Sequence, residues 1–183
     1  LLFNIYINDF INSSSILKFI LFADDTTLLY SHSDFNVLIS FINYELKHIY
    51  NWVVSNNLRI NLEKTCFILF GPKIRTDIVF PNIFLNNCAI KRVNSFKFLG
   101  VIIFSNLSWL GHIKHISCKL SRNLGLIYRL KFKFPRFILL TLYNSLDLPY
   151  LTYCVSVWGS APKSNLHNLT LAQNFFLRLI FIF

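Results

Sequence analysis

The sequence has no methionine and little charge. Only 14% of its 183 residues are Asp, Glu, Lys or Arg, and it contains five glycines and five prolines. So few glycines and prolines exclude a collagen-like or low-complexity chain, and a hydrophobic content of 54% excludes a disordered one. Because no Met marks a start, we expect a piece of a longer protein, more apolar than an ordinary soluble domain.

The sequence also lacks a run of residues long enough to cross a membrane. Its longest uncharged stretch, Phe98–Ile113, is interrupted by glycine, asparagine and serine and is shorter than the roughly 20 apolar residues that a spanning helix needs. The four cysteines form no closely spaced pair, which argues against a zinc site or a disulfide framework. We expect buried, reduced thiols in an intracellular protein at Cys66, Cys88, Cys118 and Cys154.

Acidic residues are scarce after residue 77. Residues 1–77 contain six basic and seven acidic side chains, whereas residues 78–183 contain twelve basic side chains and a single acid, Asp147. This asymmetry predicts an acidic site in the first part of the chain and a surface that faces a polyanion in the second. A basic surface that serves only solubility is the alternative.

Two apolar runs flank an acidic pair near the N-terminus. Ile16–Phe22 and Thr27–Tyr30 are compatible with strands, and Asp24 and Asp25 stand between them. We therefore expect a β-hairpin with the two acids at its tip. The segment before it, Leu1–Phe10, is expected to be the end of a helix or a strand.

A long amphipathic helix is predicted after the hairpin. Apolar residues recur with a helical period from an N-cap at Ser33 or Asp34 to the pair Asn56-Asn57. Short strands that build an antiparallel layer are expected to follow, at Ile78–Phe80, Ile83–Leu85, Cys88–Val93 and Phe96–Phe104. Helix and strands in this order indicate the α+β class.

The last part of the chain is predicted to be helical. From Ser108 to Pro135 the apolar residues fall on one helix face and the basic residues on the other. Further helices are expected at Arg136–Leu146 and Leu166–Ile180. We place the domain boundary near residue 107, so that residues 1–107 form a mixed domain and residues 108–183 a helical one.

The acidic pair has a chemical interpretation. Adjacent carboxylates repel each other unless a cation compensates them, and a divalent metal such as Mg²⁺, which prefers oxygen ligands, is the commonest compensation. Metal ions in polymerases and nucleases stabilise both the attacking and the leaving oxygen of a phosphoryl transfer. Strands on both sides would hold Asp24 and Asp25 rigidly enough for this task. Aspartate is also frequent in tight turns for local reasons, so a purely structural turn is the alternative.

The residues around the acidic pair resemble a known family. Phe22-Ala23-Asp24-Asp25-Thr26 is similar to the aromatic-x-Asp-Asp box of reverse transcriptases, more narrowly of non-LTR retrotransposons of the jockey type. Further segments resemble motifs of these enzymes in the same order: Leu1–Asp9, Trp52–Thr65, Phe96–Val101, Leu142–Leu146, Pro149–Tyr153 and Val157–Gly159. The resemblance implies the C-terminal part of a polymerase domain, with a partial palm of antiparallel strands and packed helices followed by a helical thumb.

The resemblance also implies an activity and the residues that carry it. The reaction is RNA-directed DNA synthesis, in which a primer 3′-hydroxyl attacks a deoxynucleotide by two-metal phosphoryl transfer. It assigns Asp24 and Asp25 to Mg²⁺, or to Mn²⁺ in its place, and Lys64 to the departing pyrophosphate, with a solvated lysine at a strand edge as the alternative. It assigns the primer grip to a turn, for which a strand bulge is the alternative. The grip residues are Phe98, Leu99 and Gly100.

A basic helix face is the second candidate site. Its members would contact the phosphates of an RNA template and DNA primer duplex, as a polymerase thumb does, and no acids are interleaved with them. An ordinary solvated face is the alternative. The face consists of Lys114, Lys119, Arg122, Arg129 and Lys133. Because no third ligand lies near them in the sequence, His112 and His115 are expected to be surface or hydrogen-bonded residues rather than metal ligands.

The family pattern contains parts that this sequence does not include. A third metal-binding Asp and the fingers precede the segment that Leu1 begins, so we expect the rest of the polymerase upstream and an isolated chain that is inactive. The parent element is expected in the nucleus, with no membrane partner. Two functions compete with polymerisation: a non-catalytic remnant of a retrotransposon that only binds nucleic acid, and a structural protein that binds membrane surfaces through its basic helix.

Overall fold

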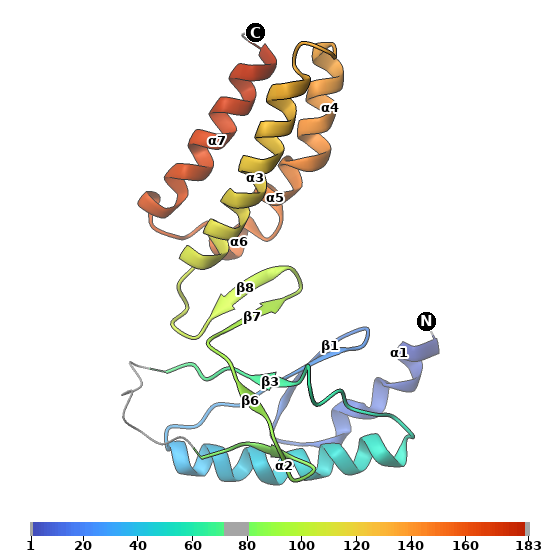
Figure 1. Cartoon of the computed structure of the whole chain (residues 1–183). Helices are drawn as coiled ribbons and strands as arrows, with labels where there is room; N and C mark the ends of the chain where they lie inside the picture. The colour runs from blue at the N-terminus through green and yellow to red at the C-terminus, as the bar shows by residue number, and fades with distance from the viewer. Residues whose placement is uncertain (1, 72–80, 182–183) are drawn as a thin grey trace. The chain divides into compact units, whose positions relative to one another are not determined.

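The chain forms two compact units in a computed structural model that describes residues 2–71 and 81–181 (Figure 1). The first unit comprises Leu1–Phe67 and Ile74–Val93, and the second comprises Ile68–Lys73 and Asn94–Phe183. Both contain helices and short strands, which agrees with the expected α+β class. The division falls after Val93, whereas the expected division at residue 107 follows the hairpin of residues 95–104. The strand expected at Ile78–Phe80 lies outside the described residues.

The first unit begins with helical segments and a hairpin. α1 (Leu2–Tyr6) and the 3₁₀ helix η1 (Asn8–Ser13) show that the N-terminal element is helical. β1 (Lys18–Phe22) and β2 (Asp25–Leu29) then pair antiparallel over five residue pairs, and the last pair joins Phe22 to Asp25. The predicted hairpin with the acidic pair at its tip is therefore confirmed.

The predicted long helix is α2 (Phe35–Ser55). Asp34 is its N-cap, because one carboxylate oxygen accepts hydrogen bonds from the backbone N–H groups of Asn36 and Val37, at 2.8 and 3.1 Å. These bonds satisfy donors that have no partner inside the helix. The helix ends as expected at Asn56, and Asn57 follows with a φ of 52°, a left-handed conformation that asparagine tolerates.

The apolar face of α2 forms one side of the core of the first unit. Phe10 of η1 connects this face to the hairpin: its ring centroid lies 5.4 Å from that of Phe19 in β1 and 4.6 Å from that of Trp52 in α2. The hairpin, η1 and α2 thus share one core. The buried members of this core are Ile7, Phe10, Leu17, Leu38, Ile39, Leu46, Ile49, Val53, Ile83 and Leu85.

The other strands of the first unit are short. β4 (Phe84–Leu85) pairs antiparallel with β5 (Cys88–Ala89), whereas β3 (Cys66–Phe67) pairs parallel with β6 (Lys91–Arg92). The expected strand Cys88–Val93 is thus divided into β5 and β6, and the expectation of antiparallel strands alone is wrong. The chain that connects β3 to β6, residues 68–90, is longer than the dozen or so residues that a parallel crossover requires.

The second unit begins with a hairpin where we expected a single strand. β7 (Ser95–Phe98) and β8 (Val101–Phe104) pair antiparallel, and Phe98 lies opposite Val101. Leu99 and Gly100 form the two-residue turn with positive φ values of 43° and 90°. Two positive φ values match the turn whose twist suits a tight hairpin, and glycine reaches this conformation readily. One strand over Phe96–Phe104 is therefore wrong, and the turn implied by the family resemblance is present.

Helices make up the rest of the second unit. α3 (Leu110–Leu130), α4 (Arg136–Leu146) and α7 (Lys163–Phe181) pack side by side (Figure 1), and α5 (Leu148–Thr152) and α6 (Val155–Trp158) are short. The predictions of α3, α4 and α7 are confirmed, although α7 begins before Leu166. The buried core of this unit consists of Ile113, Ile116, Leu120, Ile127, Leu139, Tyr143, Trp158, Ala161, Leu169, Phe176 and Ile180.

The structure tests two further expectations about composition. All four cysteines are free, but Cys88 and Cys118 are exposed, so the expectation of buried thiols is wrong for these two. Cys66 and Cys154 are half-buried. Across residues 2–71 and 81–181, no helix combines the length and the hydropathy needed to pass through a bilayer.

Removal of the Asp34 cap will test the local origin of α2. The variant Asp34→Ala leaves two N–H groups of the first turn without their acceptor, so we expect the free energy of unfolding to fall by about 1 kcal/mol. The measurement is urea unfolding followed by circular dichroism. Asp34→Ser is the control, because serine also accepts these bonds and should keep most of the stability.

Asp147 is a buried acid in the core of the second unit. Its side chain has no exposed surface, one oxygen accepts a hydrogen bond from the Asn123 side-chain amide at 3.0 Å, and the other oxygen has no hydrogen-bond partner. Burial raises the pKa of Asp147 to about 6, although the bond from Asn123 opposes this change. The folded chain therefore holds a proton on this carboxyl over a pH range in which the unfolded chain has lost it.

The raised pKa predicts a direction of pH dependence. The stability that protonated Asp147 contributes is present at low pH and falls as the pH rises from about 4 through about 6. The reason is that a buried carboxyl is harder to ionise in the folded state than in the unfolded state. Relative to Asp147→Asn, the wild type should lose about 1–2 kcal/mol between pH 5 and pH 8. Urea unfolding at both pH values measures this difference. An equal change in the free energy of unfolding from pH 5 to pH 8 in the two proteins would contradict the prediction.

Candidate functional site

The acidic pair lies at the tip of the β1–β2 hairpin. Ala23 and Asp24 form the two-residue turn, and Asp25 is the first residue of β2. Both aspartates are exposed, and within the described chain neither carboxylate has a hydrogen bond or an ion pair. Two neighbouring negative charges with no compensating partner leave the tip ready to bind a cation.

The turn itself is strained. Ala23 has a φ of 50°, in the left-handed region, where a Cβ atom costs roughly 1–2 kcal/mol relative to the ordinary helical conformation. Glycine, asparagine or aspartate would usually occupy such a position. The pairing on both sides of Ala23 holds this conformation, and strained residues of this kind cluster at functional sites.

One face of the β1–β2 hairpin packs on the core of the first unit, and this packing positions the tip. Phe19 and Leu21 alternate with exposed neighbours along β1 and, together with Leu28 of β2, pack against the core of the first unit. Because side chains alternate across a strand, the register of the five pairs fixes which face is buried and therefore where the tip is held.

The donor set of the tip suits a hard divalent cation but is incomplete. Carboxylate oxygens are the ligands that Mg²⁺ prefers, and Asp24 and Asp25 offer them side by side. Among the residues that the structure describes, no group of three or more His, Cys, Asp or Glu side chains could hold a metal ion. The pair thus fits as part of a site, to which water, substrate phosphate or another acid would add the remaining ligands.

Lys64 lies in a turn before β3, not at a strand edge. Its backbone N–H donates a hydrogen bond to the Asn61 side-chain oxygen at 3.2 Å, and the Thr65 hydroxyl donates to the Asn61 carbonyl at 2.7 Å. These bonds order the turn, while the Lys64 ammonium is exposed and forms no ion pair with Asp24 or Asp25. The structure thus leaves the side chain free to meet an anionic group.

The turn at Phe98–Gly100 is held by a tyrosine from the helical part of the second unit. The Tyr153 hydroxyl donates a hydrogen bond to the Leu99 carbonyl at 2.6 Å. A Cβ atom on Gly100 would lie 3.2 Å from the ring of Tyr153, so glycine allows the close approach as well as the positive φ. The neighbouring Cys154 raises the pKa of Tyr153 above its ordinary value.

A histidine fastens the same hairpin at β8. The Ile102 N–H donates to Nδ1 of buried His112 at 3.2 Å, which requires Nδ1 to be unprotonated. Burial, helped by the nearby His115, lowers the pKa of His112 and favours this neutral form. His112 is thus a buried, hydrogen-bonded residue, which confirms the second of the two expected possibilities, a surface or a hydrogen-bonded histidine. Its Nε2 has no partner among the described residues.

Trp158 contacts both Tyr153 and His112, the two residues that bond to the β7–β8 hairpin. The Trp158 indole N–H donates to the Tyr153 carbonyl at 2.9 Å, and its ring centroid lies 5.9 Å from that of His112. Gly111 adds a close contact, because a Cβ atom there would fall 2.1 Å from the ring of Phe104 in β8. Sequence reasoning did not find these supports, since their partners are brought together only by packing.

The basic face of α3 is present in the second unit. Lys114, Arg122 and Arg129 are exposed there and Lys119 is half-buried, and none of them is among the buried residues of α3. Lys133 is exposed in the turn after the helix. Asp147, the single Asp or Glu side chain of residues 94–181, is fully buried, so no acidic side chain exposed in that range competes for these cations.

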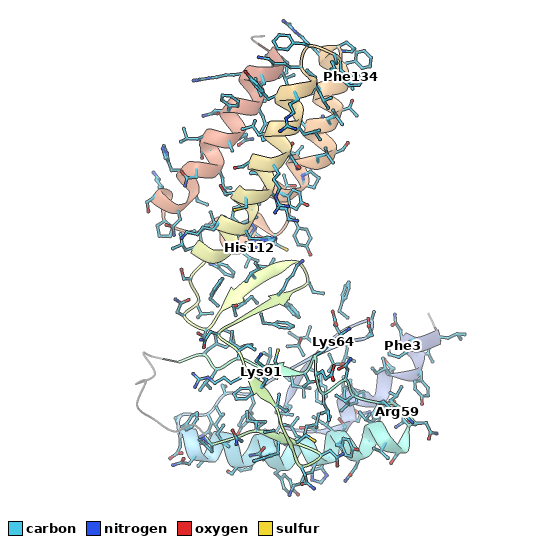
Figure 2. All side chains as sticks on the ribbon, in the orientation of Figure 1. Phe3, Arg59, Lys64, Lys91, His112 and Phe134 are labelled. Atoms are coloured by element: carbon cyan, nitrogen blue, oxygen red, sulfur yellow. The ribbon has the colours of Figure 1, made fainter. Side chains whose placement is uncertain are left out.

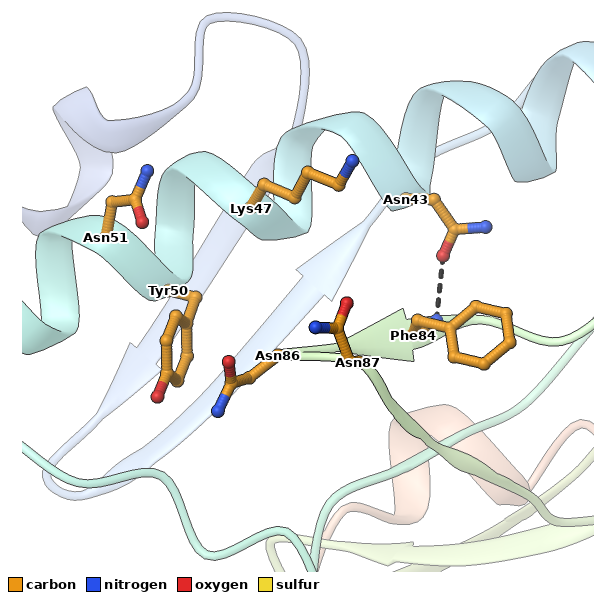
Figure 3. A pocket seen from close by; sticks show the side chains of 7 residues that line it. All are labelled: Asn43, Lys47, Tyr50, Asn51, Phe84, Asn86 and Asn87. Atoms are coloured by element: carbon orange, nitrogen blue, oxygen red, sulfur yellow. Dashed lines mark hydrogen bonds between the residues drawn. The ribbon is translucent and has the colours of Figure 1, made fainter.

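A further hollow of about 500 Å³ lies between α2 and the β4–β5 turn (Figure 3). Asn43 closes one side, because its side-chain oxygen accepts from the Phe84 N–H at 2.7 Å and its amide donates to the Asn82 carbonyl at 3.3 Å. The remaining lining residues are Lys47, Tyr50, Asn51, Asn86 and Asn87. The sequence did not predict this group of amides, and the two bonds of Asn43 to the backbone indicate a structural joint between α2 and β4.

Comparison with known proteins assigns the family. Residues 1–103 match the family described as reverse transcriptase (RNA-dependent DNA polymerase). The chain belongs to the reverse transcriptase family. This match includes the acidic pair, Lys64 and the turn at Phe98–Gly100, whereas the basic face of α3 follows it.

Several curated reverse transcriptases resemble the chain beyond residue 103. It is 28% identical over 163 residues to the RNA-directed DNA polymerase from mobile element jockey of Drosophila melanogaster, and 26% identical over 162 residues to the probable polymerase from transposon X-element of the same species. The jockey polymerase of Drosophila funebris is 24% identical over 164 residues. These alignments cover 87% of this reverse transcriptase chain but only 17–18% of each relative. No solved structure matches it significantly.

The support of the Phe98–Gly100 turn can be tested by removing one hydroxyl group. Tyr153→Phe keeps the ring but loses the hydrogen bond to Leu99, which should lower stability by about 1 kcal/mol and speed amide hydrogen exchange in residues 98–101. Exchange followed by mass spectrometry checks this. Tyr150→Phe is the matched control: Tyr150 is a partly exposed tyrosine of α5 whose hydroxyl forms no hydrogen bond in the described chain. Unchanged hydrogen exchange of residues 98–101 in Tyr153→Phe would show that the bond from Tyr153 to Leu99 does not support the turn.

Proposed function

We propose that this chain is the C-terminal part of the polymerase domain of a non-LTR retrotransposon, with a partial palm in residues 1–107 and a thumb in residues 108–183. Its activity is RNA-directed addition of deoxynucleotides to a primer 3′-hydroxyl. The observation that carries the proposal is the exposed, uncompensated Asp24-Asp25 pair at a strand-held hairpin tip in a member of the reverse transcriptase family.

In this mechanism the acidic pair binds the metal that the reaction requires. Mg²⁺ bound there, or Mn²⁺ in its place, would stabilise the negative charge that develops on the phosphate oxygens in the transition state. Asp24 and Asp25 would contribute oxygen ligands, and the hairpin register fixes the backbone from which both side chains extend. The exposed ammonium of Lys64 would stabilise, or give a proton to, the departing pyrophosphate.

The second unit binds the nucleic acid in this mechanism. The turn at Phe98–Gly100 holds the primer, and its fastening by Tyr153 and His112 makes it a firm support. The basic face of α3 contacts phosphates of the template–primer duplex, an interaction that is insensitive to sequence and weakens with salt. Positioning of primer and nucleotide is the larger part of the protein's work in such a transfer.

A non-catalytic nucleic-acid-binding remnant is the second candidate. The observation that favours it is the second unit, which exposes basic residues and buries its single acid, together with a metal site that lacks a third acid in the described chain. The two candidates differ in what they require of the acidic pair. Polymerisation needs Asp24 and Asp25, whereas electrostatic binding needs only the basic face.

The decisive experiment is a chimera in which this chain replaces the aligned segment of the jockey polymerase. We expect primer extension on an RNA template with Mg²⁺ for the chimera and none for the chain alone, since two carboxylates make an incomplete site. Asp24→Asn and Asp25→Asn should each lower extension by roughly 100-fold or more, because they remove a charged ligand of the metal.

Controls separate the two candidates. Asp9→Asn changes another exposed acid of the first unit and should leave extension unchanged. An extension rate that survives Asp24→Asn would overturn the polymerase role of the pair. If binding to a template–primer duplex then disappears in the charge reversals Arg122→Glu and Arg129→Glu, the remnant is the correct function.

A further inference from the structure

The turn between α3 and α4 carries an unusual sequence. Residues 128–137, which we name the α3–α4 tip, alternate aromatic and basic side chains without any acid. Figure 1 shows the tip at the end of the helix pair α3 and α4, and Phe134 is labelled there in Figure 2. Its aromatic members are Tyr128, Phe132, Phe134 and Phe137, and its basic members are Arg129, Lys131, Lys133 and Arg136.

The aromatic side chains of the tip are not part of a core. Phe132 is 85% exposed and Phe137 is 70% exposed, the former being among the most exposed apolar side chains of the described residues. Tyr128 and Phe134 are 51% and 41% exposed. Large apolar groups that cluster on a surface usually mark an interaction site, because leaving them in water gains nothing for the fold.

The backbone presents these rings from a fixed turn. The N–H groups of Lys133 and Phe134 both donate to the Leu130 carbonyl, at 2.9 and 3.1 Å, and continue the end of α3. Pro135 is the N-cap of α4, and its carbonyl accepts from the N–H groups of Ile138 and Leu139. The tip is therefore ordered before any partner binds, which lowers the entropy that binding must overcome.

The cations of the tip are arranged around the rings. The Lys131 ammonium lies 4.6 Å from the centroid of the Tyr128 ring and 4.7 Å from that of the Phe132 ring, within the range of cation–π contacts. Arg129, Lys133 and Arg136 are exposed. Asp147, the single Asp or Glu side chain of residues 94–181, is buried, so the exposed side chains of the tip carry positive charge with no acidic side chain of that range exposed beside them.

We propose that the α3–α4 tip is a binding site for an unpaired nucleic-acid strand, whose bases stack on Phe132 and Phe137 and whose phosphates contact the surrounding cations. Base stacking on aromatic rings combined with a basic track is the chemistry by which proteins bind single strands. A duplex contributes phosphates but keeps its base faces stacked inside, so it would use the cations and leave the rings unused. The site is separate from the acidic pair and does not rest on the proposed polymerase activity.

Fluorescence anisotropy with labelled 12-nucleotide single-stranded RNA and with a 12-base-pair RNA–DNA duplex tests the proposal. The double variant Phe132→Leu, Phe137→Leu keeps apolar, exposed side chains but removes the π faces. It should bind the single strand about tenfold or more weakly, since each stacked base contributes measurably, and bind the duplex within about twofold of the wild type. Because both rings are exposed, circular dichroism should show an unchanged helical content.

Matched variants separate stacking from charge. Tyr44→Leu removes a 58% exposed ring on α2 and should leave both affinities unchanged. The double variant Lys131→Gln, Lys133→Gln should bind both the single strand and the duplex more weakly, and its affinity should depend less on salt. Asp24→Asn should keep single-strand binding, so a failed polymerase test and a failed tip test remain distinguishable.

Two outcomes would overturn the proposal. One is equal affinity of the wild type and the Phe132→Leu, Phe137→Leu variant for single-stranded RNA. The other is displacement of the RNA by vesicles of phosphatidylserine and phosphatidylcholine to which the leucine variant binds as well as the wild type does. That second result would identify the tip as a membrane-surface contact, where apolar character rather than stacking determines affinity.

Discussion

Register in the β1–β2 hairpin is the constraint on which the candidate catalytic site depends. Five residue pairs set which face of the hairpin packs on the core with Phe10 and α2, and they also place Ala23 and Asp24 in the turn. A slip of one residue would move every buried side chain to the solvent face and carry the acidic pair away from its position. The strain at Ala23 is tolerated because this pairing surrounds it.

The second unit uses a comparable arrangement to hold a different turn. Leu99 and Gly100 have positive φ values, and Tyr153, Trp158 and His112 connect their hairpin to the helices through hydrogen bonds and ring contacts. In the first unit strand pairing and the packing of one hairpin face on the core hold the turn, whereas in the second unit side chains from the helices bond to the hairpin directly. This explains why the hairpin of residues 95–104 groups with the helices and not with the strands that precede it.

Local patterns predicted much of the fold because they act over a few residues. The helical period and the Asp34 cap gave the bounds of α2, and the apolar runs beside Asp24 and Asp25 gave the first hairpin. Predictions failed where short strands were too brief to show a period, as in β5 and β6. The strand expected over Phe96–Phe104 failed because its apolar residues continue through the turn, and only the positive φ values at Leu99 and Gly100 reveal the break.

The sequence by itself determined the four longest helices, the acidic pair, the uneven distribution of charge and, through its motifs, the family. Only the tertiary structure decided which side chains support the turn at Phe98–Gly100, where the buried acid Asp147 lies, and which aromatic rings remain in water at the α3–α4 tip. The physical reason is range. Periodicity and capping depend on neighbours within one or two turns, whereas Tyr153 meets Leu99 across 54 residues only after the core has packed.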